Sequence, residues 1–127
     1  MENPSENPTA QYQETDIGQT TISPDVLLVI IQLTTVHVPG VSRMSSVPGG
    51  VNRILRRGSG EGVRIVVKDG TVSVDLYVIL KNNINMRDVS RNIQNDVARA
   101  ISTMVGMHAG RINIHIEDID YPEESEA

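Results

Sequence analysis

A few side chains in this sequence are of types that carry out chemistry, but their spacing completes no catalytic pattern. Ser59 is flanked by glycines, yet it lacks the surrounding nucleophile-elbow motif, and no signal places a general base beside it. The three histidines, His37, His108 and His115, are far apart, and none belongs to a His-Glu-x-x-His zinc motif. We therefore predict that the protein is not an enzyme and that it uses no cofactor.

Metal binding also has little support in the sequence. The chain contains no cysteine, which excludes a thiolate zinc site, a disulfide framework and a cysteine nucleophile. Asp118 and Asp120 lie two residues apart, so on a strand their carboxylates would share one face and could attract a divalent cation. Because no further oxygen ligand is evident, we predict a solvated strand end and no metal site.

The segment 42–62 is rich in glycine and arginine and matches no regular element. Its glycines form neither a phosphate-binding loop nor a dinucleotide fingerprint. Arg53, Arg56 and Arg57 surround Ile54 and Leu55, and we consider these three arginines candidates for contact with an anionic membrane surface. The alternative is that the two apolar residues hold the loop against the core while the arginines stay in water.

The clearest element is a central β-hairpin between Val63 and Lys81. Apolar residues alternate on both sides of Asp69-Gly70, a pair that favours a type I′ turn because both of its positions need positive φ. The resulting register pairs Val67 with Val72. Eight residues are predicted on the core face: Val63, Ile65, Val67, Val72, Val74, Leu76, Val78 and Leu80. The other face is mixed and carries Tyr77 and Ile79.

Two helices are predicted around this hairpin. Ser23-Pro24-Asp25 is a typical helix start, and Pro39-Gly40 ends the helix that follows. A second helix begins after an Asn85 cap and ends at Gly106. Its helical spacing predicts one apolar stripe: Val89, Ile93, Val97, Ala100, Ile101 and Met104.

Two further strands complete the predicted fold. Val41 to Met44 can add a short edge strand, and the alternation of Ile112, Ile114 and Ile116 predicts a return strand. A helix between two neighbouring strands favours parallel pairing. We therefore predict an α+β fold with a small mixed sheet, in the order helix, short strand, strand, strand, helix, strand.

The first helix is apolar almost all round. One face is expected to meet the sheet, and another to meet the second helix or another subunit. We predict a homo-oligomer, with Val26, Val29, Ile30 and Leu33 as the candidate residues for self-association.

Length and composition define the domain boundaries. We predict a disordered tail over 1–16, a single α+β domain over 17–121 and an acidic, mobile end over 122–127. No stretch is apolar for long enough to span a bilayer, and the N-terminus lacks a secretory pattern. We expect a cytoplasmic location.

The charge distribution is uneven. All eleven Lys and Arg lie between Arg43 and Arg111 together with five acids, so this stretch carries +6 although the whole chain carries -5. A basic body suggests an anionic partner or screening by the acidic flanks. Sheets that bind single strands rely on stacking aromatics, and only Tyr77 is expected on the open face. The alternative function is a nucleic-acid-binding module using the basic 43–111 body. The positive charge favours it, and the scarcity of aromatic residues disfavours it.

Several segments together carry a family resemblance. They are Gly18 to Ser23 before an aliphatic helix that ends in Pro39-Gly40-Val41, Asp69 to Ile79, and Ile93 to Met107 followed by Ile112 to Ile116. In order and spacing they resemble the alkaline shock protein family, the Gls-type general stress proteins of the bacterial envelope stress response. The resemblance covers about Gly18 to Tyr121. It implies a non-catalytic scaffold of envelope homeostasis that self-associates and lies near the inner face of the cell membrane through a membrane-anchored protein partner. Any contact of Arg53, Arg56 and Arg57 with anionic lipid is expected to be weak.

Overall fold

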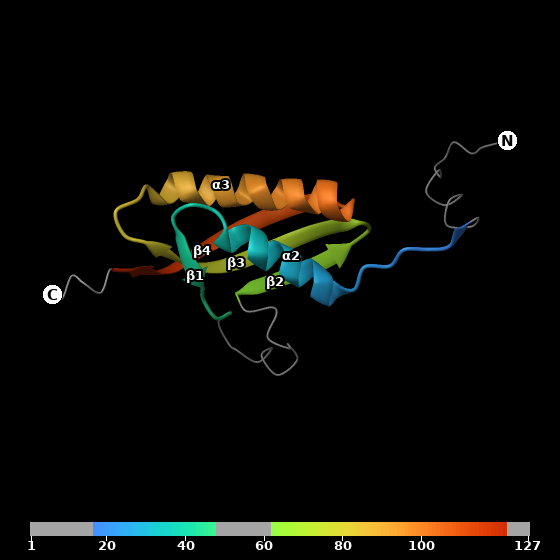
Figure 1. The fold of residues 1–127 in the computed structure, drawn as a ribbon, viewed down its shortest axis with the longest axis horizontal. Helices are drawn as coiled ribbons and strands as arrows, with labels where there is room; N and C mark the ends of the chain where they lie inside the picture. The colour runs from blue at the N-terminus through green and yellow to red at the C-terminus, as the bar shows by residue number, and fades with distance from the viewer. Residues whose placement is uncertain (1–16, 48–61, 122–127) are drawn as a thin grey trace.

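The computed structural model describes residues 17–47 and 62–121, in which helices cover one face of a four-stranded sheet (Figure 1). The elements in chain order are α2 (Pro24–Val36), β1 (Val41–Met44), β2 (Val63–Lys68), β3 (Thr71–Lys81), α3 (Met86–Arg99), the π-helix η3 (Ala100–Val105) and β4 (His108–Asp120). This confirms the predicted α+β class and the predicted order of elements. The predictions for 1–16, for Arg53, Arg56 and Arg57, and for 122–127 lie outside the described residues.

The long strand β3 forms the centre of the sheet. Along one edge it pairs in parallel with β4 over nearly its whole length. Along the other edge it pairs antiparallel with β2 through its first half and with β1 near its end. The parallel pair is separated in sequence by α3 and η3, which supply the crossover that parallel strands require. The sheet is therefore mixed, as predicted.

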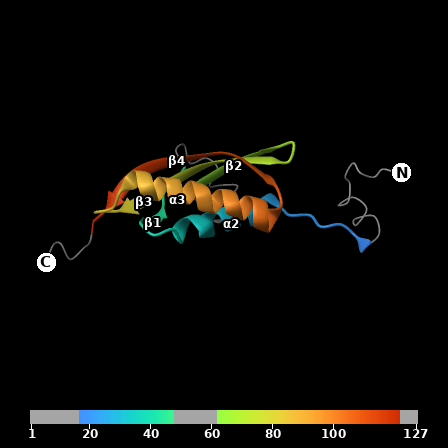
Figure 2. The ribbon, with the colours of Figure 1, turned by 90° about the horizontal axis from the view of Figure 1, so that it is seen from above.

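The hairpin has the predicted turn and register. Asp69 and Gly70 adopt φ values of 52° and 77°, as a type I′ turn needs, and Val67 pairs with Val72. The prediction that Val67 lies in the core is wrong, because its side chain is 49% exposed while Val72 beside it is fully buried. Figure 2 shows the reason: the tip of the hairpin lies away from both helices, so no helix covers the end of β2.

The helix ends follow the sequence signals with one exception. Ser23 occupies the N-cap of α2 and Pro24 its first turn, but the Ser23 side chain makes no capping hydrogen bond. At α3, Asn85 Oδ1 accepts a hydrogen bond of 3.0 Å from the backbone N–H of Asp88. Gly106 closes η3 in the left-handed conformation, with φ of 77°.

The end of the second helix departs from the predicted stripe at Met104. Residues up to Ile101 are buried as expected, but Met104 is 64% exposed. Residues 100–105 form a π-helix, whose wider turn displaces a side chain from the stripe that 3.6-residue spacing predicts. The core lies between the sheet and the two helices and is built of branched aliphatic side chains; its fully buried members include Ile31, Leu76, Leu80, Ile93 and Ile101.

Candidate functional site

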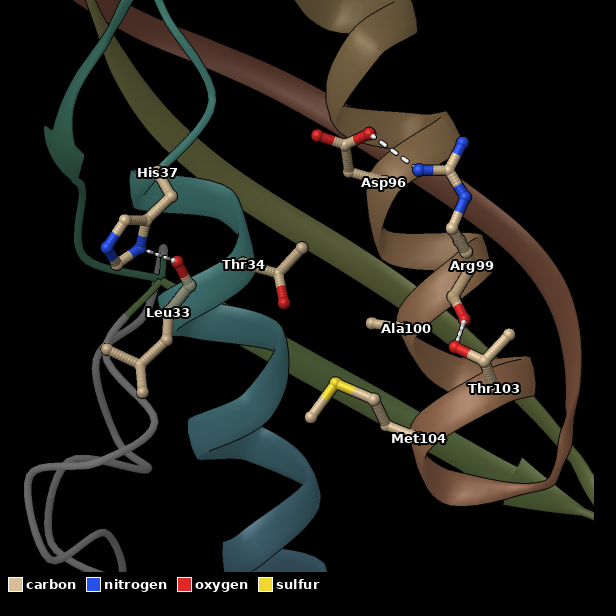
Figure 3. Close-up of a pocket in the computed structure, with 8 residues that line it drawn as sticks. All are labelled: Leu33, Thr34, His37, Asp96, Arg99, Ala100, Thr103 and Met104. Atoms are coloured by element: carbon tan, nitrogen blue, oxygen red, sulfur yellow. Dashed lines mark hydrogen bonds and ion pairs between the residues drawn. The ribbon is translucent and has the colours of Figure 1, made fainter.

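A groove runs between α2 and the C-terminal part of the second helix (Figure 3). Its volume is about 440 Å³, and eight residues line it: Leu33, Thr34, His37, Asp96, Arg99, Ala100, Thr103 and Met104. Thr34 points from α2 into the groove, and Met104 extends from η3 towards α2. The π-helical turn forms one wall of the groove, and such turns are frequent at functional sites.

The polar groups of the groove mostly bond to their own helices. Thr34 and Thr103 donate from their hydroxyls to the carbonyls four residues earlier, each at 2.7 Å. His37 Nδ1 lies 2.7 Å from the carbonyl oxygen of Leu33. Arg99 and Asp96 form an exposed ion pair of 3.8 Å. Among these described lining residues no hydroxyl is bonded to the imidazole.

The four predicted self-association residues occupy different environments on α2. Val26 and Leu33 are exposed, Leu33 to 52%, whereas Val29 and Ile30 are half-buried. Val26 and Leu33 are seven residues apart, so they lie on one face of the helix, two turns apart. We call these two residues the α2 face. The groove adjoins this face at Leu33.

The opposite face of the sheet contains a cluster that sequence reasoning missed. Tyr77, expected to be available there, is only 7% exposed, and its ring stacks on that of His115 with centroids 4.4 Å apart. His115 donates from Nε2 to Asp75 Oδ1 at 2.9 Å, and Asn113 donates to the same oxygen at 3.2 Å. Arg64 lies over Tyr77 at 5.9 Å from the ring centroid.

This cluster lowers the pKa of Asp75 and covers the ring of Tyr77 on the open sheet face. The hydrogen bond from His115 is the main reason that the pKa of Asp75 is lowered from its usual value, and partial burial opposes the shift. The expectation that Tyr77 offers a free stacking surface is therefore wrong, because His115 covers it. The contact follows from the parallel register of β3 and β4, which places Tyr77 directly beside His115.

A second polar contact crosses the sheet at Asp120. Its carboxylate accepts hydrogen bonds from Ser42 at 2.6 Å and from two nitrogens of Arg43 at 3.1 and 3.2 Å. The hydrogen bond from Arg43 is the main cause that holds the pKa of Asp120 below its usual value. Asp120 is thus paired with β1, while its side chain remains 37% exposed.

The same carboxylates do not assemble a metal site in the part of the chain that the structure describes. Asp118 Oδ1 accepts the backbone N–H of Ile119 at 2.8 Å. Across residues 17–47 and 62–121, no group of three or more His, Cys, Asp or Glu side chains is arranged to hold a metal ion. Within these ranges there is also no helix with the length and apolar character needed to cross a bilayer.

The fold and the groove together define a small α+β protein with a groove between its two helices. Comparison with known proteins identifies it further. The chain belongs to the alkaline shock protein 23 family, described as having a cell envelope-related function, whose family model matches residues 12–121. This confirms the resemblance to the alkaline shock proteins.

The similar proteins are themselves described as uncharacterized. YqhY of Bacillus subtilis (strain 168) is 25% identical over 117 residues, which cover 91% of this chain and 87% of that protein. Spy1535 of Streptococcus pyogenes serotype M6 is 35% identical over 104 residues, covering 81% of this chain and 80% of that protein. Spy1614 of the same organism is 26% identical over 106 residues, covering 80% of this chain and 88% of that protein. No solved structure matches the chain significantly.

Proposed function

We propose that this protein is a non-catalytic scaffold of cell-envelope homeostasis. It self-associates through the α2 face and acts at the inner surface of the cell membrane, where a membrane-anchored protein partner holds it. The observation that carries the proposal is the apolar surface of α2, where Val26 and Leu33 are exposed to solvent. The family's cell envelope-related function supports the setting.

The composition of α2 favours burial of this face in an assembly. Of its thirteen residues only Asp25 is charged, and its last turn contains no basic residue. A helix that faces water normally presents charged side chains on its outer surface. Val26 and Leu33 are about half exposed, so covering each of them would contribute about 1 kcal/mol to association.

A second copy of the chain is a suitable occupant because exposed apolar side chains and a groove lie next to each other on this surface. The α2 face provides projecting side chains, and the adjoining groove provides a recess with exposed Met104 on its far wall. In a two-fold assembly each copy would contribute both parts to the other. Methionine adapts its shape readily to such a contact.

The test is sedimentation velocity over a wide range of protein concentration. We expect the native protein to form dimers or larger species, and the double variant Val26→Gln with Leu33→Gln to remain monomeric. Val66→Thr is the matched control, because Val66 is an exposed apolar residue on the face of β2 that is turned away from the core. Circular dichroism and thermal melting verify that each variant is folded. Native protein that stays monomeric at every concentration, or a double variant that associates like the native protein, contradicts the proposal.

The membrane-anchored partner requires a separate experiment. Cross-linking in native cells, followed by capture from the membrane fraction, should recover a protein with a membrane anchor. Arg53, Arg56 and Arg57 remain candidates for an additional contact with anionic lipid. Replacing all three with Ala should weaken co-sedimentation with anionic vesicles if they make that contact. Recovery of nucleic acid instead of an envelope protein would favour the alternative function, for which the covered ring of Tyr77 removes the expected stacking surface.

A further inference from the structure

The end of the β2–β3 hairpin exposes apolar side chains on both of its faces. Val66 is 60% exposed and Val67 is 49% exposed. Because successive residues of a strand point to opposite faces, these two valines project on the two sides of the sheet. Figure 2 shows this tip lying away from the helices, so a flat surface can approach it.

Cationic side chains surround these valines. Lys68 follows Val67 directly at the end of β2, and Arg64 precedes Val66 by two residues, on the same face. The start of β4 adds a third cation at this end of the sheet. The His108 N–H donates to the carbonyl of Gly70 at 3.0 Å, and the register shift that follows leaves Arg111 near Ser73.

Two of these three charges are available for an external partner, since Arg64 lies over the ring of Tyr77. Within the described parts of the chain, Lys68 and Arg111 make no ion pair. The nearest strand carboxylate, Asp75, is engaged by His115 and Asn113. Asp69 in the turn is a nearby carboxylate whose negative charge offsets part of the positive charge of Lys68 and Arg111.

We propose that this hairpin end is a contact site for an anionic lipid surface. Val66 and Val67 enter the interface between headgroups and acyl chains, and Lys68 and Arg111 lie at the level of the lipid phosphates. Exposed valines with basic neighbours suit this boundary because the valines gain from leaving water and the cations gain from the surface charge. The site lies on different residues from the α2 face and from Arg53, Arg56 and Arg57.

A lipid surface fits the chemistry better than a nucleic acid does. Single-stranded nucleic acid is bound by stacking its bases on aromatic rings. The exposed apolar side chains at this tip are aliphatic, and the ring of Tyr77 further along β3 is covered by His115. Two valines and the cations nonetheless give only a weak contact, so binding should depend strongly on salt.

The first experiment removes charge from this site. Partitioning onto vesicles of equal parts phosphatidylglycerol and phosphatidylcholine is measured at low salt for native protein and for Lys68→Gln with Arg111→Gln. Each cation should raise the affinity for the vesicles about five-fold, so the double variant should bind about 25-fold more weakly than the native protein. The control, Lys81→Gln with Arg91→Gln, removes the same net charge from exposed positions elsewhere, at the far end of β3 and on α3. We expect it to bind nearly as well as the native protein.

The second experiment tests insertion of the tip. The chain contains no tryptophan, so Val67→Trp introduces a single indole probe. Its fluorescence should shift to the blue when the anionic vesicles are added, while Met86→Trp, a probe at an exposed position that begins α3, should not shift. Val66→Thr, which keeps the shape and strand propensity of valine, should reduce partitioning.

Three results would overturn the proposal. Equal losses in the two charge variants would show that net charge alone determines binding. Unshifted fluorescence of Val67→Trp on vesicles that have bound the protein would place the tip outside the interface. Preferential binding of a single-stranded oligonucleotide that displaces the vesicles would assign the basic hairpin end to nucleic acid.

Discussion

At the scale of single residues, Gly62 occupies the position where β1 and β2 meet on the same edge of β3. Tyr77 donates its N–H to the Gly62 carbonyl, and Ser45 donates its N–H to the Tyr77 carbonyl. Gly62 has φ of 76°, and a Cβ there would lie 2.6 Å from the oxygen of Ser45 and 2.9 Å from that of Tyr77. Backbone atoms cannot move aside as a flexible side chain can, so this junction requires glycine.

Gly62→Ala should therefore lower the free energy of unfolding by about 2 kcal/mol or more. Gly70→Ala is the matched control, because Gly70 has φ of 77° but open space around its Cβ position. Its loss should be about 1 kcal/mol, from backbone strain alone. Chemical denaturation of both variants measures the difference. Equal losses would show that the close approach at Gly62 has no energetic consequence.

The carboxylate of Asp75 should make the free energy of unfolding depend on pH in the acid range. The hydrogen bond from His115 lowers its pKa in the folded protein. A lowered folded-state pKa means that the stabilising contribution is complete above the unfolded value of about 4 and is lost as the pH falls through the folded value. Asp75→Asn should make the denaturation midpoint less sensitive to pH below about 4. An unchanged acid dependence in urea titrations would show that Asp75 contributes nothing to it.

At the scale of elements, the two helix starts differ in a way that can be measured. Asn85 accepts a capping hydrogen bond from Asp88, whereas the Ser23 side chain makes no such bond. Asn85→Ala should cost about 1 kcal/mol of stability, and Ser23→Ala clearly less. Thermal or chemical denaturation provides the comparison. A larger loss at Ser23 would contradict the observed difference between the caps.

The elements that could be predicted from sequence are those set by local chemistry. The type I′ turn at Asp69-Gly70 and the cap at Asn85 depend on neighbouring residues, and both are present as predicted. The errors concern whether another element of the fold covers a given side chain. Alternation placed Val67 correctly on its strand face, but it could not show that no helix covers that face. Regular helical spacing likewise missed the π-helix that exposes Met104.

The groove was only partly predictable for the same reason. Leu33 was selected from the apolar character of the first helix, and it lies at the groove. Arg99, Thr103 and His37 join it because α2 packs beside α3, which is a tertiary arrangement without a local signal. The pairing of Tyr77 with His115 required the parallel register of β3 and β4, which the sequence implies only after the topology is known.

At the scale of the whole molecule, the two proposed surfaces lie on different elements. The α2 face is part of the helical layer, while the proposed lipid contact is the end of the sheet's hairpin. Figure 1 shows that α2 begins at the end of the molecule where the hairpin turns. An assembly through α2 would therefore carry several hairpin tips on one particle, and linked weak contacts bind far more tightly than single ones.

Self-association should consequently control lipid binding at physiological salt, where a single tip is largely screened. The variant Val26→Gln with Leu33→Gln keeps the hairpin intact, yet it should bind phosphatidylglycerol vesicles at least about ten-fold more weakly than the native protein. The complementary variant, Lys68→Gln with Arg111→Gln, should still self-associate in sedimentation velocity while it loses vesicle binding. Together the two variants separate assembly from lipid contact. If the α2 variant is monomeric and still binds vesicles as strongly as the native protein, avidity has no part in membrane contact and each hairpin tip acts alone.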